Sequence, residues 1–236
     1  MNGFWFGAFP YIALTLFVVG SIYRYKVGFK YSSLSSQFLE AKQLYTGSVP
    51  FHVGIIVIFF AHLIAFLFPS ISFGGHALIN METLMLAFSL MALAGLVVLF
   101  VRRVTNERIM MVTNKMDLVI EVLLLLQFII GIYIAISLRW GSVWYASDMV
   151  PYLWSIFTFH PDIAAISAAP LLIQLHVVFA FAIILLIPFS RLVHFLVAPF
   201  HYITRPYQIV RWNWDRKKIR DPKTPWEEAV QRPKNN

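Results

Sequence analysis

Cysteine is absent from this chain of 236 residues, and only 13% of its residues are charged. Without thiolates the chain forms no disulfide and ligates neither a cysteine-type zinc ion nor an iron–sulfur cluster. Any iron–sulfur centre that works with this protein must therefore belong to another subunit. Acidic residues are also few, 11 against 19 lysines and arginines, which leaves a net charge of +8.

Long apolar segments make up most of the remaining sequence. The chain is 59% hydrophobic and has a mean hydropathy of +0.72, values typical of a membrane protein. Five segments each have about the 20 residues of a spanning helix, and lipid cannot satisfy the backbone polar groups of an open strand. The segments are Phe4–Tyr23, Phe51–Pro69, Thr83–Val101, Met116–Leu138 and Pro170–Ser190. We therefore predict an all-α integral membrane protein, with a five-helix membrane domain over residues 1–203.

The placement of the basic residues predicts the orientation of these helices. Eighteen of the 19 lysines and arginines lie in the first connection, the third connection or the region after the fifth segment, and the remaining one is Arg139. Because positive residues mark the cytoplasmic side, we expect the N-terminus outside and the C-terminal tail in the cytoplasm, in a multi-pass protein of the cell membrane. We expect the first segment to be retained, since no basic region precedes it. This distribution accounts for the net charge without a nucleic-acid partner.

Two polar regions flank the fifth segment. Residues 139–169 carry several tryptophans and tyrosines, as a membrane interface does, and we expect them on the outer surface with a short helix. Residues 204–236 are basic and aromatic and cannot build a core of their own. Two interpretations stay open for this tail: a solvated segment attracted to anionic lipid, or an arm that docks cytoplasmic partner subunits.

Two histidines lie 18 residues apart along one apolar stretch, His176 and His194. At about 100° per residue, an uninterrupted helix would present both from one face, about 27 Å apart. That separation is close to the roughly 30 Å of the hydrocarbon core. Pro188 lies between them and predicts a bend.

Two further histidines, in the second segment, complete two pairs. His52 and His62 are ten residues apart, about 15 Å along one broad side of a helix. The second and fifth segments run antiparallel, so His52 should meet His194 near the cytoplasm and His62 should meet His176 nearer the outside. Each pair would offer one imidazole from either side, as a bis-histidine haem requires. We predict two haem b groups with these four histidines as iron ligands.

Two alternative roles stay open for the four histidines. A membrane histidine can simply hydrogen-bond to a neighbouring helix, although ionisable residues within a membrane are functional candidates by default. A metal or haem transporter also uses histidines, but it usually adds carboxylates at the same depth, and the second and fifth segments contain none. His76, His160 and His201 are expected to be ordinary interfacial residues.

The chain resembles the gamma subunit of respiratory nitrate reductase, a di-haem cytochrome b, over most of its length. The residues that carry the resemblance are Pro10-Tyr11-Ile12-Ala13, Gly20-Ser21, Arg24-Tyr25, Gly28, Ser35-Ser36-Gln37, Phe51-His52-Val53-Gly54-Ile55, His62, Leu175-His176, Pro188-Phe189-Ser190-Arg191-Leu192-Val193-His194 and Tyr202-Ile203-Thr204-Arg205-Pro206-Tyr207-Gln208. The resemblance implies the same pairing of the histidines. It also implies that membrane quinol is oxidised near the outer haem and that electrons pass to an iron–sulfur subunit and then to a molybdenum catalytic subunit.

Two residues depart from the family pattern near the expected quinol pocket beside His62. Ala61 stands where the family often has glycine, and Glu82 stands where a lysine is expected. Glu82 is a candidate acceptor for a quinol proton, or alternatively a charge at a helix N-terminus. Near the cytoplasm, Arg191 is a candidate partner for a haem propionate, or alternatively a basic anchor at the membrane surface.

The alternatives to nitrate reductase are the cytochrome of a related respiratory complex, of the sulfite or heterodisulfide reductase type, and a metal or haem transporter. A haem spectrum and the identity of the copurifying subunits distinguish them.

Overall fold

A computed structural model describes residues 2–27, 36–37, 39–70, 75–138 and 145–197. The tail 204–236 and the predicted boundary after residue 203 lie outside the described residues, as do His201 and the tryptophans at 140 and 144.

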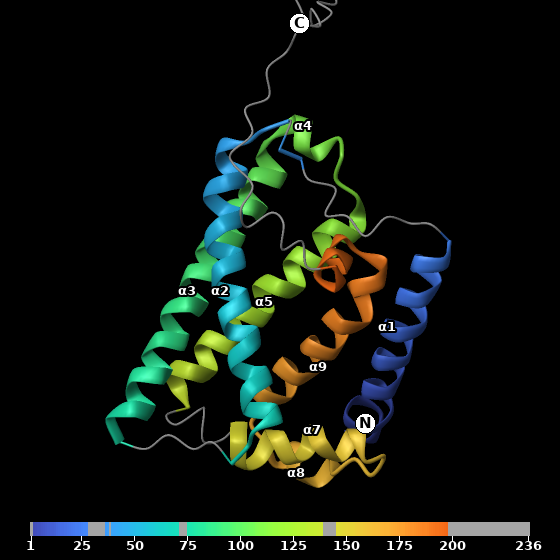
Figure 1. Cartoon of the computed structure of the whole chain (residues 1–236), viewed down its shortest axis with the longest axis vertical. Helices are drawn as coiled ribbons and strands as arrows, with labels where there is room; N and C mark the ends of the chain where they lie inside the picture. The colour runs from blue at the N-terminus through green and yellow to red at the C-terminus, as the bar shows by residue number, and fades with distance from the viewer. Residues whose placement is uncertain (1, 28–35, 38, 71–74, 139–144, 198–236) are drawn as a thin grey trace, which may run out of the picture. The chain divides into compact units, whose positions relative to one another are not determined.

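The regular structure of the described residues is entirely helical (Figure 1). In chain order the elements are η1 (Gly3–Ala8), α1 (Phe9–Lys26), α2 (Lys42–Leu67), α3 (Gly75–Thr105), α4 (Glu107–Met110), α5 (Lys115–Ser137), η2 (Tyr145–Met149), α7 (Val150–Phe157), α8 (Ile163–Ala168), α9 (Leu171–Leu186), η3 (Ile187–Phe189) and η4 (Arg191–Leu196). Five of the helices are long and apolar enough to cross a membrane: η1 with α1, then α2, α3, α5, and α9 with η3. The predicted all-α fold with five membrane helices is confirmed.

The predicted starts of the second and third helices are wrong. Helix α2 begins at Lys42 instead of Phe51, and α3 begins at Gly75 instead of Thr83. An apolar run marks the length of helix that lipid can cover, whereas backbone hydrogen bonds carry the helix further into polar surroundings. His76 therefore lies in the first turn of α3 and not in a loop. Glu82 lies two turns inside α3, so it does not cap the N-terminus of that helix.

Helices α2 and α3 pack at backbone contact, through glycines. A Cβ atom at Gly54 would lie 2.5 Å from the carbonyl oxygen of Phe88, and one at Gly95 would lie 2.5 Å from the carbonyl oxygen of Gly47. In lipid, close backbone approach at small residues replaces the hydrophobic effect as the source of helix association. This pair therefore holds the histidine-bearing α2 in a fixed register on α3.

The remaining helices extend the bundle from α3. Helix α3 packs on α5, α5 on α9, and α9 on α1. A buried apolar cluster between α2, α3 and α5 contains Phe51, Ala92, Leu96, Ile120, Leu124 and Phe128, and residues of α9 border it. The histidine-bearing helices α2 and α9 thus share a core built largely by the helices between them.

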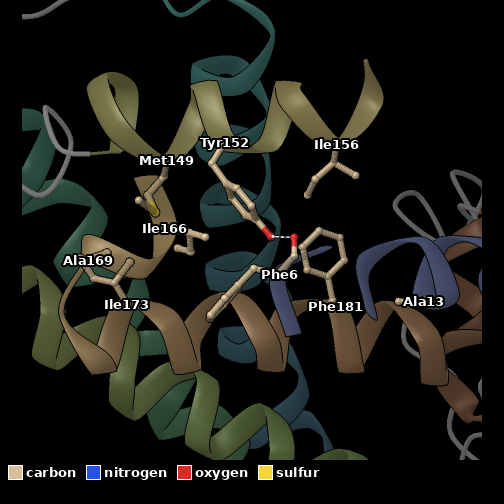
Figure 2. Packing of buried hydrophobic residues seen from close by; sticks show 9 residues of the cluster. All are labelled: Phe6, Ala13, Met149, Tyr152, Ile156, Ile166, Ala169, Ile173 and Phe181. Atoms are coloured by element: carbon tan, nitrogen blue, oxygen red, sulfur yellow. Dashed lines mark hydrogen bonds between the residues drawn. The ribbon is translucent and has the colours of Figure 1, made fainter. Parts of the chain in front are cut away.

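A pair of short helices, α7 and α8, covers the end of the bundle opposite α4 (Figure 1). They confirm the short helix predicted in the fourth connection. Their buried residues join those of η1, α1 and α9 in one cluster, which Figure 2 shows. The Tyr152 hydroxyl at its centre donates to the Phe6 carbonyl at 2.9 Å, so this cap is tied to the start of the first membrane helix.

The fifth membrane helix does not continue to His194. Helix α9 ends at Leu186, a 3-10 turn carries Pro188, Ser190 is extended with φ −119° and ψ 179°, and a second 3-10 turn contains His194. Pro188 has no N–H for the helical ladder, which is the expected cause of the break. The predicted bend is confirmed, but the prediction that His176 and His194 share one face of a continuous helix is wrong.

The N-terminus of α2 is fixed by a buried arginine. Arg102, only 3% exposed, donates to the Glu40 carboxylate at 2.7 Å, and two backbone N–H groups of the first turn of α2 also donate to that carboxylate. Partial burial on its own raises the pKa of Glu40, but the hydrogen bonds from Arg102 and from the Gln43 and Leu44 amides together lower it below its ordinary value of 4.5.

We expect the interactions of the Glu40 carboxylate to make the stability of the protein sensitive to acid. A carboxyl with a lowered folded-state pKa stabilises the fold above its unfolded-state pKa, and this stabilisation is lost as the pH falls through the folded-state value. Between about pH 5 and about pH 3, the midpoint temperature of thermal unfolding should therefore fall more steeply with pH in the natural protein than in a Glu40→Gln variant. A Glu107→Gln variant, changed in the short α4, serves as the control. Equal pH dependence of all three proteins would contradict the role of Glu40.

Candidate functional site: two histidine pairs

The first histidine pair joins α2 to the turn beyond α9. The rings of His52 and His194 are neighbours, with their centroids 6.1 Å apart and their planes tilted by 55°. Helix α2 supplies one ring and η4 supplies the other, 142 positions later in the chain. The structure thus brings His52 and His194 together, as predicted from their similar depth in the membrane.

Hydrogen bonds fix which nitrogen of the ring is available in three of the four histidines. In each of them Nδ1 contacts a backbone carbonyl oxygen three or four residues earlier. The contacts are His52 to Ser48 at 2.7 Å, His62 to Ile58 at 2.9 Å, and His194 to Arg191 at 2.6 Å. Because a carbonyl only accepts, Nδ1 must carry the hydrogen, and the lone pair remains on Nε2. Histidines that bind metals typically donate their other N–H in this way.

The spacing of the first pair fits an iron ion between two imidazoles. Metal–imidazole bonds are about 2 Å long, so two such bonds together with the two ring radii place the ring centroids roughly 6 Å apart. The 6.1 Å between the centroids of His52 and His194 agrees with that figure. Together with the free lone pairs on Nε2, this spacing fits the axial ligation of a haem.

The second pair lies toward the end of the bundle that α7 and α8 cover. It consists of His62 on α2 and His176 on α9. Tyr145 packs edge-on against the His62 ring, with centroids 5.2 Å apart, and donates to the His62 carbonyl at 3.2 Å. Trp154 donates to the carbonyl of Phe66, one turn further along α2. The elements η2 and α7 therefore hold the end of α2 that carries His62.

His176 differs from the other three histidines in its hydrogen bonds. Its Nε2 lies 3.2 Å from the side-chain nitrogen of Gln127 on α5. Its Nδ1 is buried and has no hydrogen-bond partner. The edge of the ring that holds both nitrogens faces Gly131, where a Cβ atom would lie 3.0 Å from Cε1. Helix α5 thus lies against the nitrogen-bearing edge of this ring.

Ala61 and Glu82 lie at the level of the second pair. The contacts that fix the antiparallel register of α2 and α3 are Gly47 with Leu99 and Gly54 with Phe88. Continuing that register by two turns brings Ala61 and His62 level with Glu82. Both Ala61 and Glu82 are partly buried.

Arg191 belongs to a cluster of buried charges near the first pair. Its Nε lies 2.9 Å from Asp117, which is 2% exposed, and its Nη2 donates to the Val112 carbonyl at 2.7 Å. Arg103 bridges Asp117 and Glu121 in the same cluster. Asp117 also forms a capping box with Asn114 at the start of α5. The cluster fixes the turn that carries His194 against the third connection.

Arg24 holds the break between α9 and η4. Its Nη1 donates to the carbonyls of Pro188 and Ser190, at 2.6 and 3.1 Å. Both carbonyls lie where the helical ladder is interrupted and need donors from elsewhere. Gly20, one turn earlier on α1, lets that helix approach Pro188 closely. Arg24 is therefore a structural partner of the turn that presents His194.

We expect Arg24→Met to weaken the first histidine pair selectively. Losing a charged hydrogen bond to a buried carbonyl costs about 1.5–3 kcal/mol, and the turn with His194 would lose its register. Cofactor content and optical spectrum of the purified variant should show a loss confined to the His52–His194 pair. Lys26→Met, an exposed residue on the same helix, should change neither. A loss shared equally by both pairs would show that Arg24 acts on the whole bundle instead.

Several residues at these sites were not found from the sequence. Gln127 is a polar residue within an apolar helix, and that contrast was the available signal. Ser48, four residues before His52, contacts His52 Nδ1 through its hydroxyl as well, at 3.1 Å. Within the described part of the chain, no three His, Asp or Glu side chains gather into a group that could hold a bare metal ion.

The fold and these sites define a multi-pass helical membrane protein with one close histidine pair, His52 and His194, and two further histidines, His62 and His176, toward the end of the bundle that α7 and α8 cover. A family model described as nitrate reductase gamma subunit matches residues 2–213. The chain is 34% identical over 219 residues to respiratory nitrate reductase 2 gamma chain of Escherichia coli, covering 89% of this chain and 97% of that one. It is 32% identical over 216 residues to the nitrate reductase gamma chain of Bacillus subtilis, covering 87% and 96%. The respiratory nitrate reductase 1 gamma chain of E. coli is 32% identical over 219 residues, covering 89% and 97%.

The chain belongs to the nitrate reductase gamma subunit family. It is accordingly a membrane subunit of an oxidoreductase complex that contains other subunits, with the cytochrome b character of its family.

Proposed function

We propose that this chain is a di-haem cytochrome b subunit that oxidises membrane quinol near His62 and His176. It would pass the electrons by way of haems at the two histidine pairs to a cytoplasmic iron–sulfur subunit. Nitrate would then be reduced on a molybdenum subunit and not on this chain.

The observation that carries this proposal is the His52–His194 pair. Two imidazoles from α2 and η4 lie with their centroids 6.1 Å apart, a spacing suited to one iron, and hydrogen bonds to carbonyls keep the Nε2 lone pairs available. Haem b bound there and at His62 and His176 would supply reversible one-electron chemistry. Membership of the nitrate reductase gamma family supports the same cofactor class.

The end of the bundle with His62 has the features that a quinol site needs. Oxidising a quinol releases protons, and a carboxylate at the right depth can accept one. We assign that role to Glu82, which lies level with Ala61 and His62. The cap formed by η2, α7 and α8 closes over this end and brings Tyr145 against His62.

The other end of the bundle has the features of a cytoplasmic docking face. The lysines and arginines among the described residues lie at the ends of α1, α2, α3 and α5, in α4 and after α9, all toward the end with α4 (Figure 1). By the positive-inside rule this end faces the cytoplasm, which puts the N-terminus outside and the C-terminal tail inside. The partner subunits would bind here, and the tail would contribute to docking.

Arg191 is proposed to neutralise a propionate of the haem held by His52 and His194. It lies three residues from His194, and Asp117 fixes its guanidinium. A fixed positive charge next to a carboxylate stabilises it more when both are withdrawn from water.

The test is to purify the full chain with its partners from the native membrane in a mild detergent. We expect a b-type band in the reduced-minus-oxidised spectrum, reduction of that band by added quinol and reoxidation by nitrate. An iron–sulfur subunit and a molybdenum subunit should copurify. A preparation without a b-type band would indicate a transporter, and a partner without molybdenum would indicate another respiratory complex. Either result would overturn the proposal.

A further inference from the structure

The four histidines fall into two classes by their hydrogen bonds. His52, His62 and His194 each donate Nδ1–H to a carbonyl of their own helix or turn. His176 has no such bond, and its buried Nδ1 lacks a partner. A buried N–H without an acceptor is unfavourable and rare, so the ring of His176 is the one that still needs an acceptor from elsewhere.

Gln127 is the polar side chain that contacts this ring. Its amide nitrogen lies 3.2 Å from Nε2 of His176, and because an amide N–H only donates, the imidazole must accept through Nε2 and carry its hydrogen on Nδ1. The amide oxygen of Gln127 is itself buried without a partner. One contact thus leaves an unpaired donor on the histidine and an unpaired acceptor on the glutamine.

Gly131, one turn along α5 from Gln127, leaves room beside the ring. A Cβ atom there would be 3.7 Å from Nδ1 and 3.8 Å from Nε2, with Cε1 nearer at 3.0 Å. Both nitrogens therefore face α5, and no side chain at position 131 stops the ring from turning. The amide of Gln127 and the backbone at Gly131 therefore lie on the same, nitrogen-bearing side of the imidazole.

We propose that Gln127 is the positioning residue for His176, and that its amide oxygen accepts the Nδ1–H of this ring when Nε2 binds iron. This inference rests on the proposed function, because it concerns the haem at His62 and His176. This bond would pair Nδ1 of His176 with the amide oxygen of Gln127, the two buried atoms that lack a partner. It also makes this haem the one whose ligand is controlled by a side chain of another helix.

Such a bond should tune the redox potential. An acceptor on Nδ1–H makes the imidazole more basic, which favours the oxidised iron. Gln127→Leu removes the acceptor at similar volume, so the midpoint potential of the haem at His62–His176 should rise. Gln127→Glu supplies a stronger acceptor, so that potential should fall below the natural value. The haem at His52–His194 should keep its potential in both variants.

The experiment is a redox titration of the full-length protein in its membrane complex, followed by optical and electron paramagnetic resonance spectra. Ile129→Leu, on the exposed side of the same helix, is the matched control and should leave both potentials unchanged. Haem lost from this pair in Gln127→Leu but kept in Gln127→Glu would also support the proposal, because the glutamate retains the acceptor.

Three results would overturn the assignment: unchanged potentials in both Gln127 variants, equal shifts at both haems, or loss of the haem from both variants at normal protein abundance. A natural protein without a haem at this pair would instead refute the proposed function itself. The two failures are therefore distinguishable.

Discussion

Replacing His52 or His194 with alanine is expected to remove one haem and leave the other, and replacing His62 or His176 is expected to remove the second haem instead. In the proposed sites each histidine would contribute one of two axial bonds, so a single loss would leave that iron without bis-histidine ligation. The haem content of each variant should fall by about half. The lost spectral component should be the same for both members of a pair.

The grouping follows from the arrangement of the helices. Helices α2 and α9 run in opposite directions, and the ring of His52 lies 6.1 Å from that of His194. His160→Ala provides a control, because His160 is exposed and bonds to a nearby carbonyl. Quantitative haem extraction and difference spectra of the five variants make the measurement. Losses that group His52 with His62 would contradict the pairing.

A second large effect is expected at the contact between α2 and α3. Any side chain at Gly95 would meet backbone atoms, with its Cβ 2.5 Å from the Gly47 carbonyl and 2.6 Å from the Phe51 amide nitrogen. Backbone cannot rotate away as a side chain can, so we expect Gly95→Leu to cost about 3 kcal/mol or more, at or beyond the upper end of ordinary overpacking. Separating α2 from α3 displaces both histidines of α2, so both haems should be lost together.

The matched control is Gly3→Ala, because a Cβ atom at Gly3 meets nothing within 4 Å. The abundance of folded protein in the membrane and its haem content are the measurements. Gly95→Leu protein with natural stability and both haems would show that α2 and α3 are not held by this contact.

The five membrane helices could be predicted from the sequence because lipid imposes one solution on the backbone of a long apolar segment. The pairing of histidines by depth followed from the antiparallel direction of two such segments. The ends of α2 and α3 were harder to predict from the sequence, because polar residues continue a helix beyond its apolar part. A hydropathy pattern reports the depth of the membrane and not the length of the helix.

The details around the histidines depend on contacts between distant parts of the chain. Pro188 predicted a bend. The hydrogen bond from Arg24 to the carbonyl of the extended Ser190, however, depends on α1 lying beside the break. The ion pair of Arg191 with Asp117 joins positions 74 residues apart. Periodicity within one segment contains no information about such partners.

The unequal surroundings of the two pairs have a consequence for electron transfer. At the first pair both histidines donate to carbonyls of their own chain segment, whereas at the second pair His176 contacts Gln127 of α5 and His62 contacts Tyr145 of η2. Hydrogen bonds to axial ligands are one of the means by which a protein sets haem potentials. The two haems are therefore expected to differ in potential.

The central claim is that this one chain holds two haem b groups, each between two histidines. The most direct test is the haem-to-protein ratio of the purified full-length chain, measured together with its low-temperature electron paramagnetic resonance spectrum. We expect two haems per chain, both low-spin with two nitrogen ligands. One haem per chain, none, or a high-spin iron in the natural protein would contradict the account.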